Sequence, residues 1–315
     1  PGSAPGTGTG RVFWPNPVAT LGDPTLTDQK DADYAALQAA YYVKPLTNLD
    51  GSGYLRGDWA IVRSETGNPA FSASGNFLYD RHDDRFEQVM GYYWVTEAQK
   101  YLQHLGFGVE GGRRAINKVQ QKIRLNQLGA DNSFATDTKD ELRFGKGGVD
   151  DAEDAEVILH EYGHAIHFSQ SPDFYVSNES GAIGEGFADY FAVTVSSYIN
   201  PTADEACVAD WDSVSYTLST PHCLRRVDRN LHYPEDLNGE VHHDGMIWSR
   251  ALWDIRNGLR NSERADIIIL EAQFDFHGTT MADLAQNTVN VAQALYGTAT
   301  ANVVRSAFQA RGILP

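Results

Sequence analysis

The sequence contains few cysteines, no long apolar run and fewer basic than acidic residues. Its 315 residues include 2 cysteines, and 25 lysines and arginines stand against 42 aspartates and glutamates, so the formal net charge is −17. No apolar stretch reaches the roughly 20 residues that a membrane-spanning helix needs, and we expect no membrane association. An acidic surface repels phosphate backbones, which argues against a nucleic-acid partner.

The composition otherwise favours a globular protein. Hydrophobic residues make up 42% of the chain and charged residues 21%, which is typical of a protein with a real core. The first ten residues, PGSAPGTGTG, lack a basic segment followed by an apolar one, so we interpret them as the start of a mature or trimmed protein without a signal peptide. The acidic surface suits a soluble, secreted protein, which we expect to be a monomer.

The two cysteines, Cys207 and Cys223, bracket one short loop. A lone pair this close in sequence favours a single loop-closing disulfide and therefore an oxidising, extracellular compartment. The alternative is a pair of free, buried thiols. A zinc site at the pair is disfavoured, because neither cysteine has another cysteine two to four residues away.

Strand-like runs come first along the chain and helical patterns follow. Apolar spacing predicts a short helix over residues 31–43 and a long one over residues 85–105. The strand-like runs are WAIVR, KIRLN and ELRFG. From residue 151 onward the predicted helices are 154–169, 182–198, 244–257, 265–274, 281–296 and 302–311. This order predicts an α+β fold, or an α/β lobe beside a helical lobe, with a ligand cleft where the lobes meet.

The motif HEYGH lies at this changeover. Residues four apart on a helix share one face, so His160 and His164 can point their imidazoles at one ion. Glu161 is one step round the helix and can reach a water on that ion. The alternative is a polar patch on a buried helix.

A catalytic zinc needs a third protein ligand and one open position. The segment SGAIGEGFADYF offers Glu185 as that ligand. Asp189, one helical turn later, can accept the outer N–H of a liganding histidine. A solvated helix face is the alternative for both acids, but their apolar neighbours argue for burial, where a carboxylate needs a partner.

The stretch from HEYGH to GEGFAD resembles the active-site core of the thermolysin-like zinc endopeptidases, and most closely that of the fungalysin branch. The similar block runs from about residue 132 to residue 248. The resemblance implies a two-lobed α+β metalloprotease, with an N-terminal mixed α/β lobe over residues 1–165 and a mainly helical lobe over residues 166–315. It also implies zinc on His160, His164 and Glu185, with Glu161 as general base.

The resemblance implies roles for two further residues. Tyr175, eleven residues after the second histidine, matches a tyrosine that hydrogen-bonds the oxyanion. The segment EVHHDGMIW matches a motif in which His242 would stabilise the transition state, with His243 as the adjacent alternative. The acid that orients this histidine stays open, since Asp236 stands one residue from the position that the family uses.

Two weaker matches concern the substrate. The segment DNSFAT resembles an edge strand in which Asn132 would bind the leaving-side amide and Ser133 would pair with substrate by strand addition; an ordinary turn is the alternative. The segment CLRRVD offers Arg225, or else Arg226, for the leaving-side pocket, with a plain salt bridge as the alternative.

Members of this family often hold structural calcium beside the zinc helices. Glu156 matches one acidic position of that site, but Ser196 stands at a second and cannot supply a carboxylate. The acid-rich segment VDDAEDAE could still bind one calcium ion. Its alternative role is favourable charge at a helix N-terminus.

These features predict a secreted, zinc-dependent endopeptidase that hydrolyses internal bonds of protein or peptide substrates. The family resemblance adds an apolar preference on the leaving side and the chain's own pro-segment as an inhibitory partner. A zinc aminopeptidase is one alternative, but no acidic group stands out to hold a free amine. An inactive zinc-bearing binding module is the other, and Glu161, Tyr175 and His242 count against it. The remaining histidines receive no role.

Overall fold

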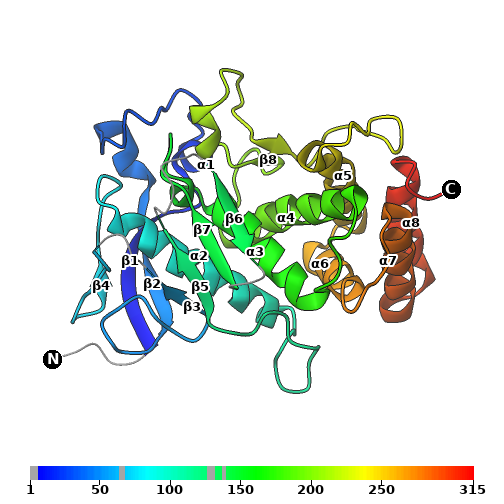
Figure 1. The fold of residues 1–315 in the computed structure, drawn as a ribbon, viewed down its shortest axis with the longest axis horizontal. Helices are drawn as coiled ribbons and strands as arrows, with labels where there is room; N and C mark the ends of the chain where they lie inside the picture. Colours follow the sequence, from blue (N-terminus) through cyan, green and yellow to red (C-terminus); the bar gives the residue numbers. More distant parts are fainter. Residues whose placement is uncertain (1–5, 64–67, 126–131, 137–139) are drawn as a thin grey trace.

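The computed structural model describes residues 6–63, 68–125, 132–136 and 140–315. Strands gather in the first half of the chain and helices in the second (Figure 1). The strands are β1 (Gly6–Phe13), β2 (Tyr41–Leu49), β3 (Ala60–Val62), β4 (Asn76–Phe77), β5 (Gln121–Arg124), β6 (Ser133–Thr136), β7 (Glu141–Phe144), β8 (Cys207–Val208) and β9 (Arg225–Arg226). The α-helices are α1 (Pro17–Leu21), α2 (Arg85–His104), α3 (Ala155–Gln170), α4 (Asn178–Ile199), α5 (Val241–Leu259), α6 (Ser262–Ala272), α7 (Met281–Tyr296) and α8 (Thr298–Ala310). The predicted α+β class is therefore confirmed.

The strands form two larger sheets and one hairpin. One sheet has the order β2-β1-β4, the second has the order β3-β5-β7-β6, and β8 pairs with β9. Strands β3, β5 and β7 run parallel, and β6 adds antiparallel to β7 at the edge. Strand β6 is therefore an edge strand of this sheet, and another strand could pair with its free edge.

The glycine-rich start of the chain forms β1, although its sequence pattern does not predict a strand. A Cβ on Gly8 would lie 2.3 Å from the carbonyl oxygen of Gly75, and one on Gly10 would lie 2.6 Å from a methyl of Val89. Glycine is required there because neighbouring backbone and α2 approach β1 closely. The strand signal is hidden because these positions carry no side chain.

The predicted helix over residues 31–43 is wrong at both ends, and no part of it is an α-helix. Residues Ala35–Ala40 form a 3₁₀ helix, and the chain then enters β2, which pairs antiparallel with β1. Tyr41, Tyr42 and Val43 favour a strand as much as a helix. The pairing with β1, whose residues Phe13, Val12 and Arg11 lie opposite Tyr41, Tyr42 and Val43, decides the conformation.

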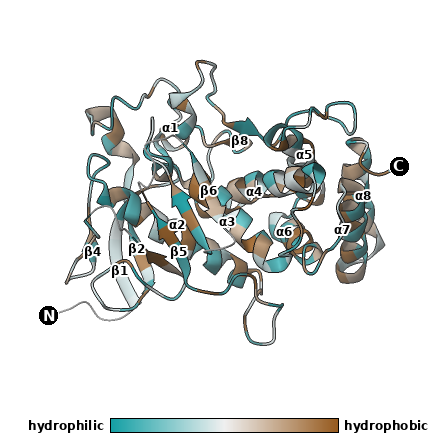
Figure 2. Ribbon diagram, in the orientation of Figure 1, coloured by the Kyte–Doolittle hydropathy of each residue, from teal (hydrophilic) through white to brown (hydrophobic). Residues whose placement is uncertain are grey.

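The other predicted helices are present, with ends shifted by a few residues. Helix α4 begins four residues earlier than predicted, because Ser177 and Ser180 form a reciprocal capping box at its N-terminus. Helices α3 and α4 are buried over most of their length, and Figure 2 shows hydrophobic and hydrophilic residues mixed along the central and the outer elements. The division of the lobes after residue 165 stays a prediction.

None of the helices in the described ranges combines the length and the low polarity that crossing a bilayer requires.

One buried carboxylate joins the central helices to α2. Asp266 of α6 accepts hydrogen bonds from the hydroxyl of Tyr190 at 2.6 Å, the hydroxyl of Thr194 at 2.8 Å and the hydroxyl of Tyr101. Tyr101 belongs to α2 and the other two belong to α4. This single side chain therefore connects three helices that are distant in sequence.

Replacing Asp266 by alanine leaves these three hydroxyls without their acceptor. We expect the Asp266→Ala variant to lose about 3 kcal/mol or more of unfolding free energy, because buried donors without partners are costly. Urea denaturation followed by circular dichroism measures the loss. The exposed Asp283 provides the matched control, and Asp283→Ala should change stability by less than about 0.5 kcal/mol. Equal stabilities of the two variants would contradict a structural role for Asp266.

Candidate active site

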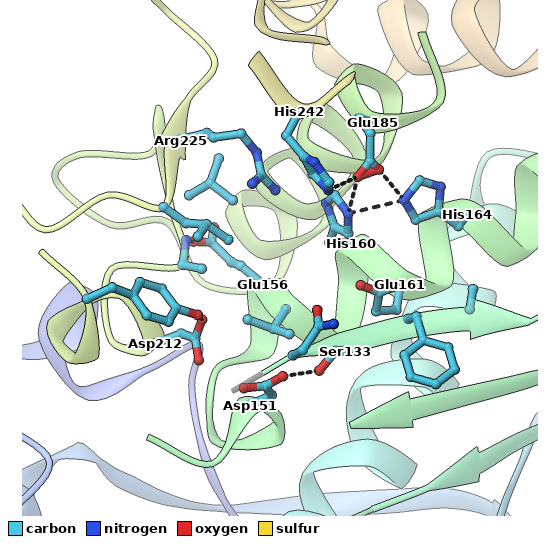
Figure 3. A pocket seen from close by; sticks show the side chains of 18 of the residues that line it. Ser133, Asp151, Glu156, His160, Glu161, His164, Glu185, Asp212, Arg225 and His242 are labelled. Carbon is cyan, nitrogen blue, oxygen red and sulfur yellow. Dashed lines mark hydrogen bonds and ion pairs between the residues drawn. The ribbon is translucent and has the colours of Figure 1, made fainter. Parts of the chain in front are cut away.

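A cavity of about 550 Å³ lies between the edge strand β6 and helices α3, α4 and α5. Its walls carry most of the residues that the sequence singled out (Figure 3). The lining residues with predicted roles are Asn132, Ser133, His160, Glu161, His164, Tyr175, Glu185, Arg225 and His242. Asp189 lies directly behind this wall.

Helix α3 presents the two histidines on one face. Its N-cap is Asp154, whose side chain accepts a hydrogen bond from the backbone N–H of Glu156. The Nε2 atoms of His160 and His164 lie 3.2 Å apart. The four-residue spacing thus places both imidazoles at one point of the cavity, as predicted.

Helix α4 brings Glu185 to the same point. Its Oε2 lies 2.7 Å from Nε2 of His164, and its Oε1 lies 3.5 Å from Nε2 of His160. A Cβ on the preceding Gly184 would lie 2.3 Å from the ring of Tyr175, and one on the following Gly186 would lie 2.3 Å from a backbone oxygen of α5. The two glycines therefore let Glu185 reach the histidines from a tightly packed helix.

The three groups fit a zinc ion. Two ligand atoms about 2.0–2.1 Å from a tetrahedral zinc lie about 3.3 Å from each other, close to the separations between His160, His164 and Glu185. Two neutral imidazoles and one carboxylate form a donor set that catalytic zinc uses. Burial raises the pKa of Glu185, but the two histidines outweigh it and hold the pKa well below its ordinary value.

Asp189 lies behind His160, and its predicted support of a metal ligand stays a prediction. Its Oδ1 accepts a hydrogen bond of 2.7 Å from Nδ1 of His160, which leaves Nε2 to face the cavity. Arg225 donates to the same carboxylate, from Nε to Oδ2 at 2.6 Å and from Nη2 to Oδ1 at 3.0 Å. Burial raises the pKa of Asp189, while Arg225 and His160 lower it by more.

Arg225 therefore both lines the cavity and forms a buried ion pair. Its neighbour Arg226 turns away and pairs with Asp204 and Asp228. The disulfide between Cys207 and Cys223 is present, with Cα atoms 5.2 Å apart. It holds the β8–β9 hairpin from which Arg225 extends, and the prediction of a loop-closing bond is confirmed.

Glu161 lines the same cavity beside the ligand histidines (Figure 3). Its side chain is buried, with 6% of the residue exposed. Burial raises its pKa, and the neighbouring histidines reduce part of that rise. A carboxylate in this setting holds a proton more readily than one in water.

His242 reaches the ligand group from the N-terminus of α5. Its Nε2 lies 2.9 Å from Oε1 of Glu185, and its Nδ1 lies 2.6 Å from Oε1 of Glu240. His243 instead contacts Asp244 and does not line the cavity. The structure thus brings His242, and not the alternative histidine, to the site.

Glu240 is the orienting acid that sequence reasoning missed. It caps α5, because Oε2 accepts a hydrogen bond from the backbone N–H of His243 at 2.6 Å. Asp236 bonds the backbone of His232 and points elsewhere. The sequence signal for this role was that Glu240 lies two residues before His242, close to the start of the predicted helix 244–257.

The hydroxyl of Tyr175 contacts Nδ1 of His164. It lies 3.2 Å from this nitrogen and 3.3 Å from Nδ1 of His167. His167, to which the sequence assigned no role, is buried among aromatic rings, and burial together with His164 lowers its pKa to about 3. The sequence did not predict the contact between Tyr175 and His167. The role of Tyr175 as a donor to the oxyanion stays a prediction.

Asn132 and Ser133 stand at the start of edge strand β6. Asn132 is exposed at the cavity wall. The hydroxyl of Ser133 donates a hydrogen bond to Asp151 (Figure 3). The pairing with substrate remains a prediction.

In the region predicted for structural calcium, Glu156 and Asp154 accept hydrogen bonds from backbone N–H groups. The backbone N–H of Ala209 donates to Glu156 at 3.0 Å, and those of Trp211 and Asp212 both donate to Asp154 at 3.1 Å. These donors stabilise the two buried carboxylates. Calcium at Glu156 stays a prediction.

Comparisons with known proteins find a similar helical domain and a similar fold. Residues 173–313 match the family model "Thermolysin metallopeptidase, alpha-helical domain". The curated relative "Probable extracellular metalloproteinase 4" of Trichophyton verrucosum (strain HKI 0517) is 27% identical over 116 residues, which are 32% of this chain and only 17% of that protein. The solved precursor of protealysin, a metalloproteinase from Serratia proteamaculans, has a TM-score of 0.60 and 16% identity, and the match covers 81% of this chain and 87% of that one. The last likeness concerns the fold alone.

The hydrogen bond from His160 to Asp189 yields a prediction about metal affinity. Asp189→Asn keeps the size of the side chain but removes the charge that orients the imidazole and pairs with Arg225. We expect zinc affinity to fall by about 10- to 100-fold, measured by competition with a chromophoric chelator. Asp228→Asn, which loses only a surface partner of Arg226, should leave the affinity unchanged. Equal affinities of both variants and the parent would show that Asp189 does not support the ligand.

Proposed function

We propose that this chain, a thermolysin-like metallopeptidase in its fold and its helical domain, is a zinc-dependent endopeptidase. The observation that carries the proposal is the meeting of three ligand atoms, from His160, His164 and Glu185, in a cavity that Glu161 also lines. The chain covers less than a fifth of its curated relative, so the reaction is argued from the cavity itself.

His160, His164 and Glu185 would hold the zinc ion. When bound there, zinc supplies Lewis acidity toward a water molecule and toward the carbonyl of the scissile bond. Asp189 and Arg225 keep His160 in the tautomer that leaves Nε2 free for the ion.

Glu161 acts as the general base. It accepts a proton from the attacking water and then delivers that proton to the nitrogen of the departing amine. Its buried position raises its pKa, which makes it a stronger base than an exposed carboxylate and suits both steps. The chain's residues form no covalent bond with the substrate in this scheme.

His242 stabilises the negative charge that grows on the carbonyl oxygen. Half of its side chain is exposed, so it stands at the mouth of the cavity, where substrate arrives. Glu240 holds its Nδ1 proton and so directs Nε2 into the cavity. Tyr175 is the second proposed donor to this oxygen; it lines the cavity beside His164.

The edge strand explains why internal bonds are the proposed target. A substrate chain can add to β6 in extended form and continue past the ligands in both directions. Asn132 lines the cavity beside that path and is proposed to bind the leaving-side amide of the substrate. Arg225 also lines the cavity and is proposed to belong to the leaving-side pocket.

Secretion is proposed from the disulfide of this chain and from the relative named extracellular. A pro-segment as inhibitory partner is proposed because the similar solved structure is a precursor. The lobes are proposed to divide after residue 165, at the C-terminal side of the two ligand histidines.

The proposed base is tested by Glu161→Gln. This variant keeps the shape of the side chain but cannot accept a proton, so we expect kcat on casein to fall by about 10³-fold or more while zinc content stays at the parent level. Treatment of the parent with a chelator should abolish hydrolysis, and added zinc should restore it. Mass analysis of a defined peptide distinguishes internal cleavage from trimming at the N-terminus. Undiminished turnover by the variant would exclude Glu161 as the base.

The proposed role of His242 makes a separate prediction. His242→Ala should lower kcat by about 10²- to 10³-fold, because one donor to the developing charge is lost. Zinc content should stay unchanged, as determined by elemental analysis. The neighbouring His243→Ala is the matched control and should keep most of the activity. Loss of zinc in His242→Ala would mean that this histidine belongs to the ligand set.

A further inference from the structure

A second group of acids lies in the N-terminal lobe and lines no part of the active-site cavity. Asp84 and Glu87 stand at the first turn of α2, and Asp150 immediately precedes the 3₁₀ helix Asp151–Glu153, which packs against α2. One carboxylate oxygen from each of the three lies within 4.8 Å of the others. The three side chains therefore face one common point.

Glu87 is the unusual member of this group. It is completely buried, and among the described residues no other side chain donates a hydrogen bond to its carboxylate; its neighbour is the carboxyl group of Asp150, a second buried acid. Oδ1 of Asp150 accepts no hydrogen bond there either. An ionised carboxylate that is buried without a positively charged partner is strongly destabilising. A proton or a cation must therefore compensate these two side chains.

The surroundings supply too little positive charge. Arg81 is buried and is shared between Glu153, at 2.6 Å, and Asp28. Lys146 pairs with Asp84 from the outer side, at 2.9 Å, and is 41% exposed. With Asp31 added, six carboxylates face these two cationic side chains. Burial raises the pKa of Glu87, and it raises that of Asp150 to about 7.

We propose that Asp84, Glu87 and Asp150 form a calcium site. Three carboxylates can offer up to six oxygen atoms, and calcium takes six to eight oxygen ligands in flexible geometry. The absence of imidazole and thiolate from the three disfavours zinc, which prefers nitrogen and sulfur. Magnesium is disfavoured because it demands near-ideal octahedral geometry and gives up its water reluctantly.

The ion would tie the start of α2 to the segment that leads into the zinc-binding helix. Asp84 and Glu87 belong to the former, and Asp150 lies five residues before α3. The site differs from the calcium position predicted at Glu156, whose carboxylate already accepts a backbone N–H. It is also independent of the proposed peptidase activity.

Calorimetric titration of the zinc-loaded protein with calcium chloride, after removal of adventitious calcium, tests the proposal. The parent should bind calcium, and its melting temperature should rise by about 4 °C at about 100 times the dissociation constant. Glu87→Gln and Asp150→Asn should each weaken binding by about tenfold or more, because each removes one charged ligand. Glu97→Gln, on the same helix and paired with Lys100, is the matched control and should bind like the parent.

Two further variants separate this site from other sources of calcium binding. Glu156→Gln should keep the affinity of the parent. Binding that survives Glu87→Gln and Asp150→Asn but disappears in Glu156→Gln would overturn the proposal and place calcium at Glu156. A parent that shows neither binding nor a thermal shift with millimolar calcium would overturn it as well, and Glu87 and Asp150 would then share a proton. The same titration with magnesium chloride should give weaker binding, and tighter binding would contradict the choice of calcium.

Discussion

The close packing of α4 between α3 and α5 is the constraint on which the candidate active site depends. A Cβ on Gly163 of α3 would lie 3.0 Å from the backbone of Ala188 in α4, and one on Gly186 of α4 would meet the backbone of α5. Such contacts hold the helices close enough for Glu185 to reach both ligand histidines. Because the ligands stand on buried helices, their separations are set by packing rather than by loop conformation.

A layer of hydrogen-bonded partners supports each functional side chain from behind. Asp189 and Arg225 support His160, Glu240 supports His242, and Tyr175 contacts His164. Several of these partners come from the segments that connect the helices, and the disulfide restrains one of those segments. The connecting segments thus contribute to the orientation of groups on helices that they do not belong to.

The chain has more acidic than basic residues, and many of the acidic side chains are buried. These buried carboxylates have different partners. Asp154 and Glu156 accept hydrogen bonds from backbone N–H groups. Asp189 pairs with an arginine and Glu185 with two histidines. Among the described residues, no arginine or histidine pairs with Glu87, whose neighbour is the buried acid Asp150. This contrast is the reason that a cation is proposed at Glu87.

The sequence by itself determined the α+β class, the long helices and the positions of His160, Glu161 and His164, because helical spacing is a local property that neighbouring residues encode. Tertiary structure decided what local patterns cannot specify. The strand β1 depends on pairing with distant residues. Glu240, and not Asp236, came to face His242, and Tyr175 came to contact His167 as well as His164. Each of these outcomes depends on how separate segments approach in space, and spacing along the chain does not encode that approach.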